Sequence, residues 1–181
     1  ATFTIALNSQ PTASVSIALS SSDTTEGTVA PASVTFTTAT WGVPQTVTVT
    51  GVNDAVQDGN QPYTIVTAPA TSADLTYNGV NAANVSASNT DDDSAGATVT
   101  PTSGLVTTEA GGSATFTIVL ASQPTAIVTI GLSSSDTTEG TVTPASVTFT
   151  SVNWSAPQIV TVSGLNDAVQ DGNQPYTIVT A

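Results

Sequence analysis

The sequence predicts an all-β protein built from two tandem antiparallel β-sandwiches. Apolar residues alternate with Thr and Ser along short segments that Gly, Pro, Asn or Asp bound, and this period of two is typical of half-buried strands. No segment shows the longer apolar period of a helix. Residues 1–68 recur as residues 114–181, with 54 of the 68 positions identical. The resulting period of 113 residues matches one autonomous sandwich domain, so we expect one repeat over residues 1–93 and a second over residues 94–181.

Each repeat is expected to be an immunoglobulin-like sandwich of seven antiparallel strands. In the first repeat the strands are predicted over residues 3–7, 15–19, 34–36, 47–49, 63–65 and 84–90. The second repeat begins with an additional strand over residues 97–106 and repeats the next five. By this count the first repeat lacks its first strand and the second lacks its last. We expect either that the chain continues in both directions, which the period favours, or that adjacent subunits exchange strands.

The composition argues against most kinds of catalysis. The chain has 13 acidic residues, no Lys, Arg, His, Cys or Met, and a formal net charge of −13. It therefore has no ordinary general base near neutral pH, no thiol nucleophile and no cation to hold a phosphate. Its charge would repel nucleic acids and anionic lipids, and no segment is apolar enough for a membrane helix. We expect a non-enzymatic protein with no nucleic-acid partner and no membrane insertion.

The acidic residues are predicted to gather at one end of each sandwich. Counting antiparallel strands places 12 of the 13 carboxylates in connections at the same end, and only Asp74 at the other. The first repeat contributes Asp23, Glu26, Asp54, Asp58, Asp91, Asp92 and Asp93, and the second contributes Glu109, Asp136, Glu139, Asp167 and Asp171. A solvated acidic surface is the simple interpretation of such residues. Because no cation balances the cluster, we favour Ca²⁺, which binds oxygen ligands on irregular loops.

This pattern resembles the Calx-beta domain. An acid after the first strand, an Asp-containing connection near residue 54 and the closing Asp-Asp-Asp after residue 90 carry the resemblance. It implies a calcium-binding set of Asn53, Asp54, Asp58, Asp91, Asp92, Asp93, Glu109, Asn166, Asp167 and Asp171. The connection that carries Asp23, Glu26, Asp136 and Glu139 aligns poorly with the family, so these four are secondary candidates.

The expected function is mechanical: an extracellular repeat of a bacterial adhesin, surface layer or filament that calcium stiffens. Its partners would be neighbouring repeats of the chain or neighbouring subunits of a fibre. A calcium-sensing module, a carbohydrate-binding module and a glycosidase with two carboxylates are the alternatives. Trp41, Trp154 and Tyr77 are predicted at the less acidic end, where packing against a neighbouring domain is favoured over sugar binding. The near-identical repeats favour a spacer.

Overall fold

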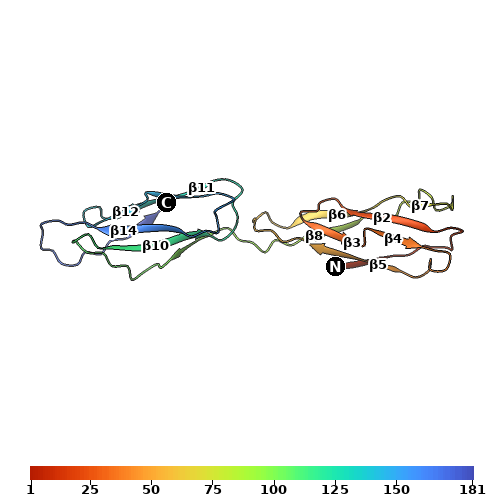
Figure 1. Ribbon diagram of the computed structural model, residues 1–181, viewed down its shortest axis with the longest axis horizontal. Helices are drawn as coiled ribbons and strands as arrows, with labels where there is room; N and C mark the ends of the chain where they lie inside the picture. The colour runs from red at the N-terminus through yellow and green to blue at the C-terminus, as the bar shows by residue number, and fades with distance from the viewer. The chain divides into compact units, whose positions relative to one another are not determined.

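The computed structural model describes all residues from Ala1 to Ala181 and contains fifteen β-strands and no helix (Figure 1). The all-β prediction is therefore confirmed. The chain forms two compact units, one of Ala1–Asp54 and Asp58–Asp91 and one of Ala55–Gln57 and Asp92–Ala181. With only strands and turns in the structure, there is no helix with the length and apolar character needed to cross a membrane.

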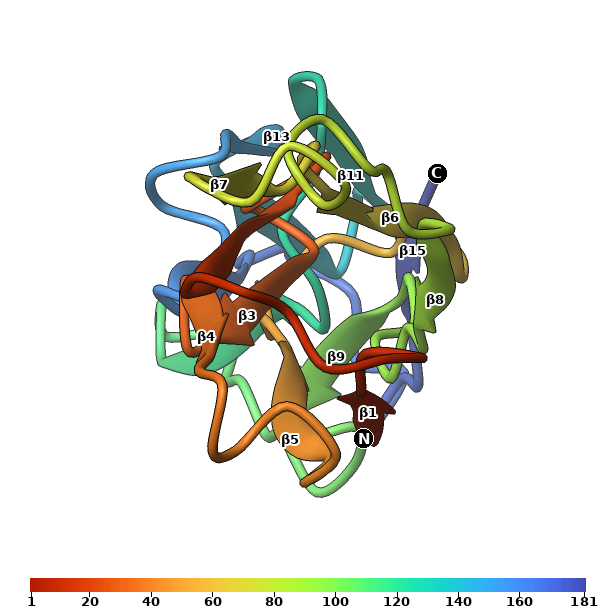
Figure 2. The ribbon, with the colours of Figure 1, turned by 90° about the vertical axis from the view of Figure 1, so that its right-hand side faces the viewer.

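The first unit contains two antiparallel sheets. Its smaller sheet has the order β1-β5-β3, formed by β1 (Thr2–Ile5), β5 (Gln45–Gly51) and β3 (Gly27–Ala30). The larger sheet has the order β4-β2-β6-β8, with β7 paired to β2. Its strands are β2 (Val15–Ser21), β4 (Ser33–Phe36), β6 (Gln61–Thr67), β7 (Thr71–Ser72) and β8 (Val85–Asn89). Figure 2 looks along these strands and shows β1 and β5 on the side opposite β6 and β7.

The second unit repeats this arrangement with different edge strands. One sheet has the order β12-β14-β10-β9, formed by β9 (Ala97–Thr100), β10 (Ser113–Leu120), β12 (Gly140–Thr143) and β14 (Gln158–Gly164). The other has the order β13-β11-β15, formed by β11 (Val128–Ser134), β13 (Ser146–Phe149) and β15 (Ile178–Thr180). In the second unit β9 pairs with β10, whereas the equivalent β1 of the first unit has no such neighbour. In the first unit β8 pairs with β6, whereas in the second unit no strand lies in this position beside β15.

The core of each unit lies between its two sheets. In β5, Val47 and Val49 are buried while the threonines between them are exposed, as the period of two requires. Buried residues of β2 and β4, among them Phe36, pack with Val47 and with the partly buried Phe3 of β1. Phe149 occupies the position equivalent to Phe36 in the second unit, and neither ring is exposed. The repeated apolar positions of the sequence thus form two equivalent cores.

Three details of the predicted strands were wrong. A strand at Gly27–Ala30, and its equivalent at Gly140–Thr143, lies in a connection that was expected to be a loop. The short β7 also lies within an expected loop. The strand predicted over residues 97–106 ends at Thr100, because Pro101 has no N–H to donate to the β10 ladder.

Asp74 fastens the long loop between β7 and β8 to the rest of the first unit. Its side chain is buried and accepts hydrogen bonds from the backbone N–H of Thr12 at 2.7 Å and of Thr76 at 2.9 Å, and from the Thr76 hydroxyl. These bonds, the one from the Thr76 hydroxyl above all, hold the pKa of Asp74 well below its usual value of 3.8. In the same loop the Tyr77 hydroxyl donates to the Ser9 carbonyl at 2.6 Å. Asp74 is therefore a structural acid.

We expect Asp74→Asn to lower the urea midpoint of the first unit at pH 7, because the ionised carboxylate accepts these bonds more strongly than an amide. A lowered pKa contributes stability above the pKa of the unfolded chain, and this contribution is lost as pH falls toward the folded value. The difference between the two proteins should therefore shrink below about pH 4. Trp41 fluorescence in a Trp154→Phe background reports the first unit. An equal difference at pH 7 and at about pH 2.5 would contradict this role.

Candidate metal centre

Strand register places one glutamate of each unit beside an acidic loop. The pairing of β3 with β5 begins at Gly27 opposite Gly51, so Glu26 lies opposite Val52 where the loop between β5 and β6 begins. The Val52 N–H donates to the Glu26 carbonyl at 3.0 Å and extends the ladder by one bond. In the second unit Gly140 pairs with Gly164, and the Leu165 N–H donates to the Glu139 carbonyl at 2.9 Å. The same register therefore repeats in both units.

The glycine after each glutamate is required by a tyrosine. A Cβ atom on Gly27 would overlap the ring of Tyr63, and a Cβ atom on Gly140 would overlap the ring of Tyr176. Only glycine leaves space for the ring at these positions. Gly27 and Gly140 thus allow a tyrosine ring to pack directly against the first residue of β3 and of β12, next to Glu26 and Glu139.

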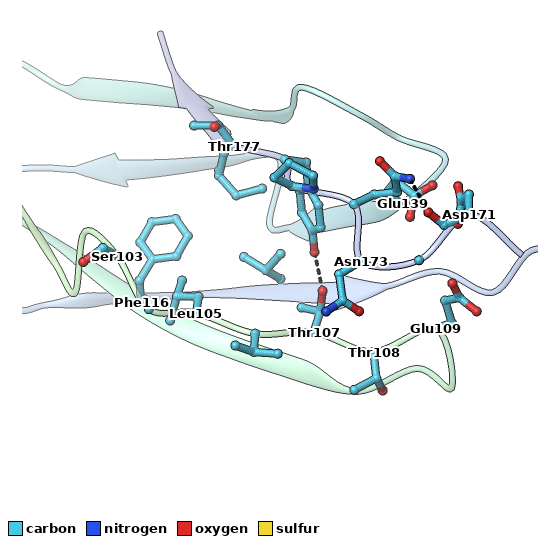
Figure 3. Close-up of a pocket in the computed structure, with 18 of the residues that line it drawn as sticks. Ser103, Leu105, Thr107, Thr108, Glu109, Phe116, Glu139, Asp171, Asn173 and Thr177 are labelled. Carbon is cyan, nitrogen blue, oxygen red and sulfur yellow. Dashed lines mark hydrogen bonds between the residues drawn. The ribbon is translucent and has the colours of Figure 1, made fainter.

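Two equivalent clusters of three carboxylates result. Glu26 meets Asp54 and Asp58 in the first unit, and Glu139 meets Asp167 and Asp171 in the second. Within each cluster one carboxylate oxygen from each residue lies within 4.8 Å of the others. The glutamates are partly buried and the aspartates are exposed. Figure 3 shows Glu139 and Asp171 side by side at one end of a groove in the second unit.

The clusters concentrate negative charge without a compensating cation, since the chain contains no Lys, Arg or His. Partial burial raises the pKa of Glu139 above its usual value of 4.5, and the charges of Asp171, Asp167, Asp136 and Glu109 raise it further. In the first unit Glu26 accepts a hydrogen bond from the Asn89 amide at 3.3 Å. The Asp167 carboxylate accepts one from the Val169 N–H at 2.8 Å. Carboxylates this close together favour a bound cation.

Each cluster has the composition of a site for a hard divalent cation. Three carboxylates from a strand end and a loop provide oxygen ligands on one side of an ion, and water or backbone carbonyls can complete the shell. The site contains no nitrogen or sulfur ligand, which zinc and copper sites usually have. Both acidic clusters could therefore hold a metal ion of the calcium or magnesium type.

Asp23 and Asp136 accept hydrogen bonds within the turns that contain them. The Asp23 carboxylate accepts from the Thr25 hydroxyl at 2.6 Å and from the Thr25 N–H at 3.0 Å. Asp136 makes the equivalent bonds with Thr138, at 2.6 and 2.9 Å. In both cases the threonine hydroxyl is the main cause of a lowered pKa. Neither aspartate belongs to a three-carboxylate cluster.

The other predicted ligands lie outside the two clusters. Asp91 approaches the β5–β6 loop, where its carboxylate accepts from the Gly59 N–H at 2.7 Å. Asp92 is exposed, Asp93 is partly buried, and both belong to the second unit. Glu109 is exposed, and its charge helps to raise the pKa of Glu139. The Asn53 amide donates to the neighbouring Asp54 carbonyl at 3.0 Å, and Asn166 is exposed.

Glu26 and Glu139 are more central than the sequence indicated, because the strand that each precedes was not predicted. The segments Gly-Thr-Val-Ala and Gly-Thr-Val-Thr each contain only one large apolar residue, which is a weak strand signal. The sequence does contain one signal, because in both copies the glutamate is followed by a glycine and then by the β-branched residues Thr and Val. A strand that begins at this glycine brings the glutamate to the loop after β5 or β14.

The aromatic residues considered for sugar binding are partly used by the fold. Trp41 and Trp154 are both partly buried in equivalent loops between strands. Their carbonyls accept backbone bonds from Leu7 at 3.4 Å and Leu120 at 3.1 Å. Tyr77 packs against the core of the first unit, and its hydroxyl is bound to Ser9. The bonds at Trp41 and Trp154 are made by the backbone, so among the three aromatic side chains only that of Tyr77 is engaged by these contacts.

Comparison with known proteins gives no family assignment. No protein-family model matches the chain, and no curated protein is detectably similar to it. The resemblance to the Calx-beta domain therefore depends only on the residues named above.

The raised pKa of Glu139 predicts a specific pH dependence in calcium-free buffer. When folding raises the pKa of an acid, the group stabilises the folded state at pH values below its pKa in the unfolded chain. This contribution to stability is lost as the pH rises through the pKa that the group has in the folded protein. Glu139→Gln should therefore stabilise the second unit at pH 7 but not near pH 4. Urea unfolding followed by Trp154 fluorescence in a Trp41→Phe background measures this. Asp92→Asn, which removes the same charge outside the clusters, is the control. Parallel pH curves for the wild type and Glu139→Gln would contradict the electrostatic account.

Proposed function

We propose that this protein is a non-enzymatic, extracellular structural repeat of a bacterial adhesin, surface layer or filament, built of immunoglobulin-like sandwiches that calcium stiffens. The calcium-binding residues are Glu26, Asp54 and Asp58 in one unit and Glu139, Asp167 and Asp171 in the other. Neighbouring repeats of the chain, or neighbouring subunits of a fibre, are its partners.

The recurrence of the cluster is the observation that carries this proposal. Each cluster combines the residue before β3 or β12 with two aspartates of the loop after β5 or β14. Across the aligned 68 positions 14 differ, and the three cluster positions are identical in the two copies. A merely solvated acidic surface does not require three carboxylates to meet within 4.8 Å in both copies.

Calcium fits these clusters better than other divalent ions do. It accepts about six to eight oxygen ligands in irregular geometry, which suits a site made from a strand end and an irregular loop. Magnesium requires near-octahedral geometry and retains most of its water. The high calcium concentration outside cells also suits a site with only three carboxylates, because extracellular modules bind calcium weakly.

Bound calcium would stiffen the end of each unit. The ion would tie the loop that holds Asp54 and Asp58 to the strand that begins after Glu26, and so would restrict the motion of a loop with little regular structure. Such stiffening serves a spacer, which must keep its length under load. A duplicated unit with one site in each copy fits this mechanical role better than it fits a sensor or an enzyme.

Calcium should raise the melting temperature well beyond any effect of ionic strength. A ligand at a hundredfold excess over its dissociation constant stabilises the folded state by about 2.7 kcal/mol. For units of this size that corresponds to a shift on the order of 10 °C. Calorimetry with CaCl₂, with MgCl₂ and with NaCl at matched ionic strength measures the shift. An equal response to calcium and to sodium would remove the basis for the metal site.

Substitutions should separate the two sites. The Asp54→Asn/Asp58→Asn variant should bind calcium at the second site alone, and Asp167→Asn/Asp171→Asn at the first alone, with roughly a tenfold or greater loss of affinity at the altered site. Isothermal titration calorimetry reports both affinities. Asp23→Asn, which removes an acid outside the clusters, should titrate like the wild type. Unchanged isotherms for both double variants would show that calcium binds elsewhere or not at all.

A further inference from the structure

Two segments of the chain have the Asn-X-Ser pattern of an N-glycan acceptor, and their structural settings differ. Asn84–Ser86 lies at the start of β8, and Asn153–Ser155 lies in the turn between β13 and β14. The pattern alone occurs often by chance. Whether an asparagine can accept a sugar in the folded protein depends on the exposure of its side chain and on what its amide nitrogen already binds.

The Asn84 side chain is held through its oxygen and not through its nitrogen. Its Oδ1 atom accepts hydrogen bonds from the Thr67 N–H at 3.0 Å and from the Thr67 hydroxyl at 3.2 Å. The residue is exposed, and its Nδ2 atom makes no hydrogen bond within the protein. An N-linked sugar is attached through Nδ2 and leaves Oδ1 as a carbonyl oxygen. Both bonds from Thr67 can therefore persist in the glycosylated protein.

The neighbours of Asn84 along the chain leave its amide accessible. The three residues before it, Asn-Ala-Ala, have small side chains. Ser86 is exposed and its hydroxyl makes no hydrogen bond within the protein, whereas Val85 between the two polar residues is partly buried. The asparagine and the hydroxyl that define the acceptor pattern are thus both open to solvent.

Asn153 is instead a structural residue of its turn. It is partly buried, and its Oδ1 atom accepts from the Thr150 N–H at 2.6 Å and from the Thr150 hydroxyl at 3.0 Å. Its Nδ2 atom donates to the Thr148 carbonyl at 3.2 Å. The bulky residues Val152 and Trp154 stand on either side of it in the chain. An enzyme could use Nδ2 of Asn153 only by opening this turn.

The internal repeat gives a reason for an asparagine at position 153 that does not involve a sugar. The equivalent residue of the first copy is Thr40. Its hydroxyl oxygen accepts from the Thr37 N–H at 3.1 Å and lies 2.9 Å from the Thr37 hydroxyl, as the Asn153 oxygen does with Thr150. The two copies thus fasten the same turn with different side-chain oxygens.

We propose that Asn84 is an N-glycosylation site of the folded protein and that Asn153 is not modified. This inference rests on the extracellular location proposed above, because N-glycosylation is a modification of surface segments in secreted proteins. The co-reactant is a sugar activated as a phosphate ester, which a separate glycosyltransferase brings to Asn84.

The transfer makes one bond and breaks one. The Nδ2 atom of Asn84 attacks the anomeric carbon of the sugar, and a carbon–nitrogen bond forms. The bond between the anomeric carbon and the phosphate oxygen breaks, and the phosphate leaves with the electron pair. Nδ2 gives up one proton to the transferase, so the product is a substituted amide whose oxygen still accepts from Thr67.

Mass spectrometry of the protein from its natural source tests this inference. The chain offers no Lys or Arg to trypsin, but cleavage after Asp and Glu releases residues 75–91, with Asn84, and residues 140–167, with Asn153. We expect a sugar on Asn84, located by electron-transfer fragmentation, and no sugar on the second peptide. In the same host Ser86→Ala should abolish the modification. Ser88→Ala, an exposed serine of β8 outside the pattern, is the matched control and should stay glycosylated.

An unmodified Asn84 would overturn the proposal, and so would a sugar on Asn153 or a glycosylated Ser86→Ala protein. Loss of the sugar from Ser88→Ala would also count against it, because that serine is no part of the acceptor. Calcium calorimetry on the same preparations keeps this inference apart from the proposed function. A protein that binds calcium without a sugar on Asn84 contradicts the glycosylation site alone, and a glycosylated protein that does not bind calcium contradicts the metal site alone.

Discussion

The close pairing that begins at Gly27 and Gly51, and again at Gly140 and Gly164, determines most of what is distinctive in this protein. Because Gly27 lacks a Cβ, the Tyr63 ring packs directly against the strand and closes that end of the core. The same register brings Glu26 to the loop that contains Asp54 and Asp58. Core packing and carboxylate clustering thus depend on one local arrangement, and both copies have it.

The two copies also show how far strand formation depends on a neighbour. Residues 61–67 and 174–180 are identical, yet the second segment is a strand only where β11 pairs with it. Propensity favours the extended conformation in both, but backbone groups in a strand need partners, and β8 supplies them only in the first unit.

Alternating apolar residues were sufficient to predict the all-β class and most strand positions, because Val, Ile and Phe recur every second residue in β2, β4, β5 and β6. They did not predict β3, where one valine gives no measurable alternation. For the same reason the sequence ranked Glu26 and Glu139 below their neighbours. It also grouped Asp23 with the cluster, because chain position shows which end a residue occupies but not that Thr25 engages its carboxylate.

We propose that each three-carboxylate cluster holds one calcium ion. A crystal structure of the chain grown with calcium, with an anomalous difference map, tests it most directly. We expect one anomalous peak among Glu26, Asp54 and Asp58 and one among Glu139, Asp167 and Asp171, with carboxylate oxygens at about 2.3–2.6 Å from each ion. Well-ordered clusters without a peak, or peaks only at other acidic residues, would contradict it.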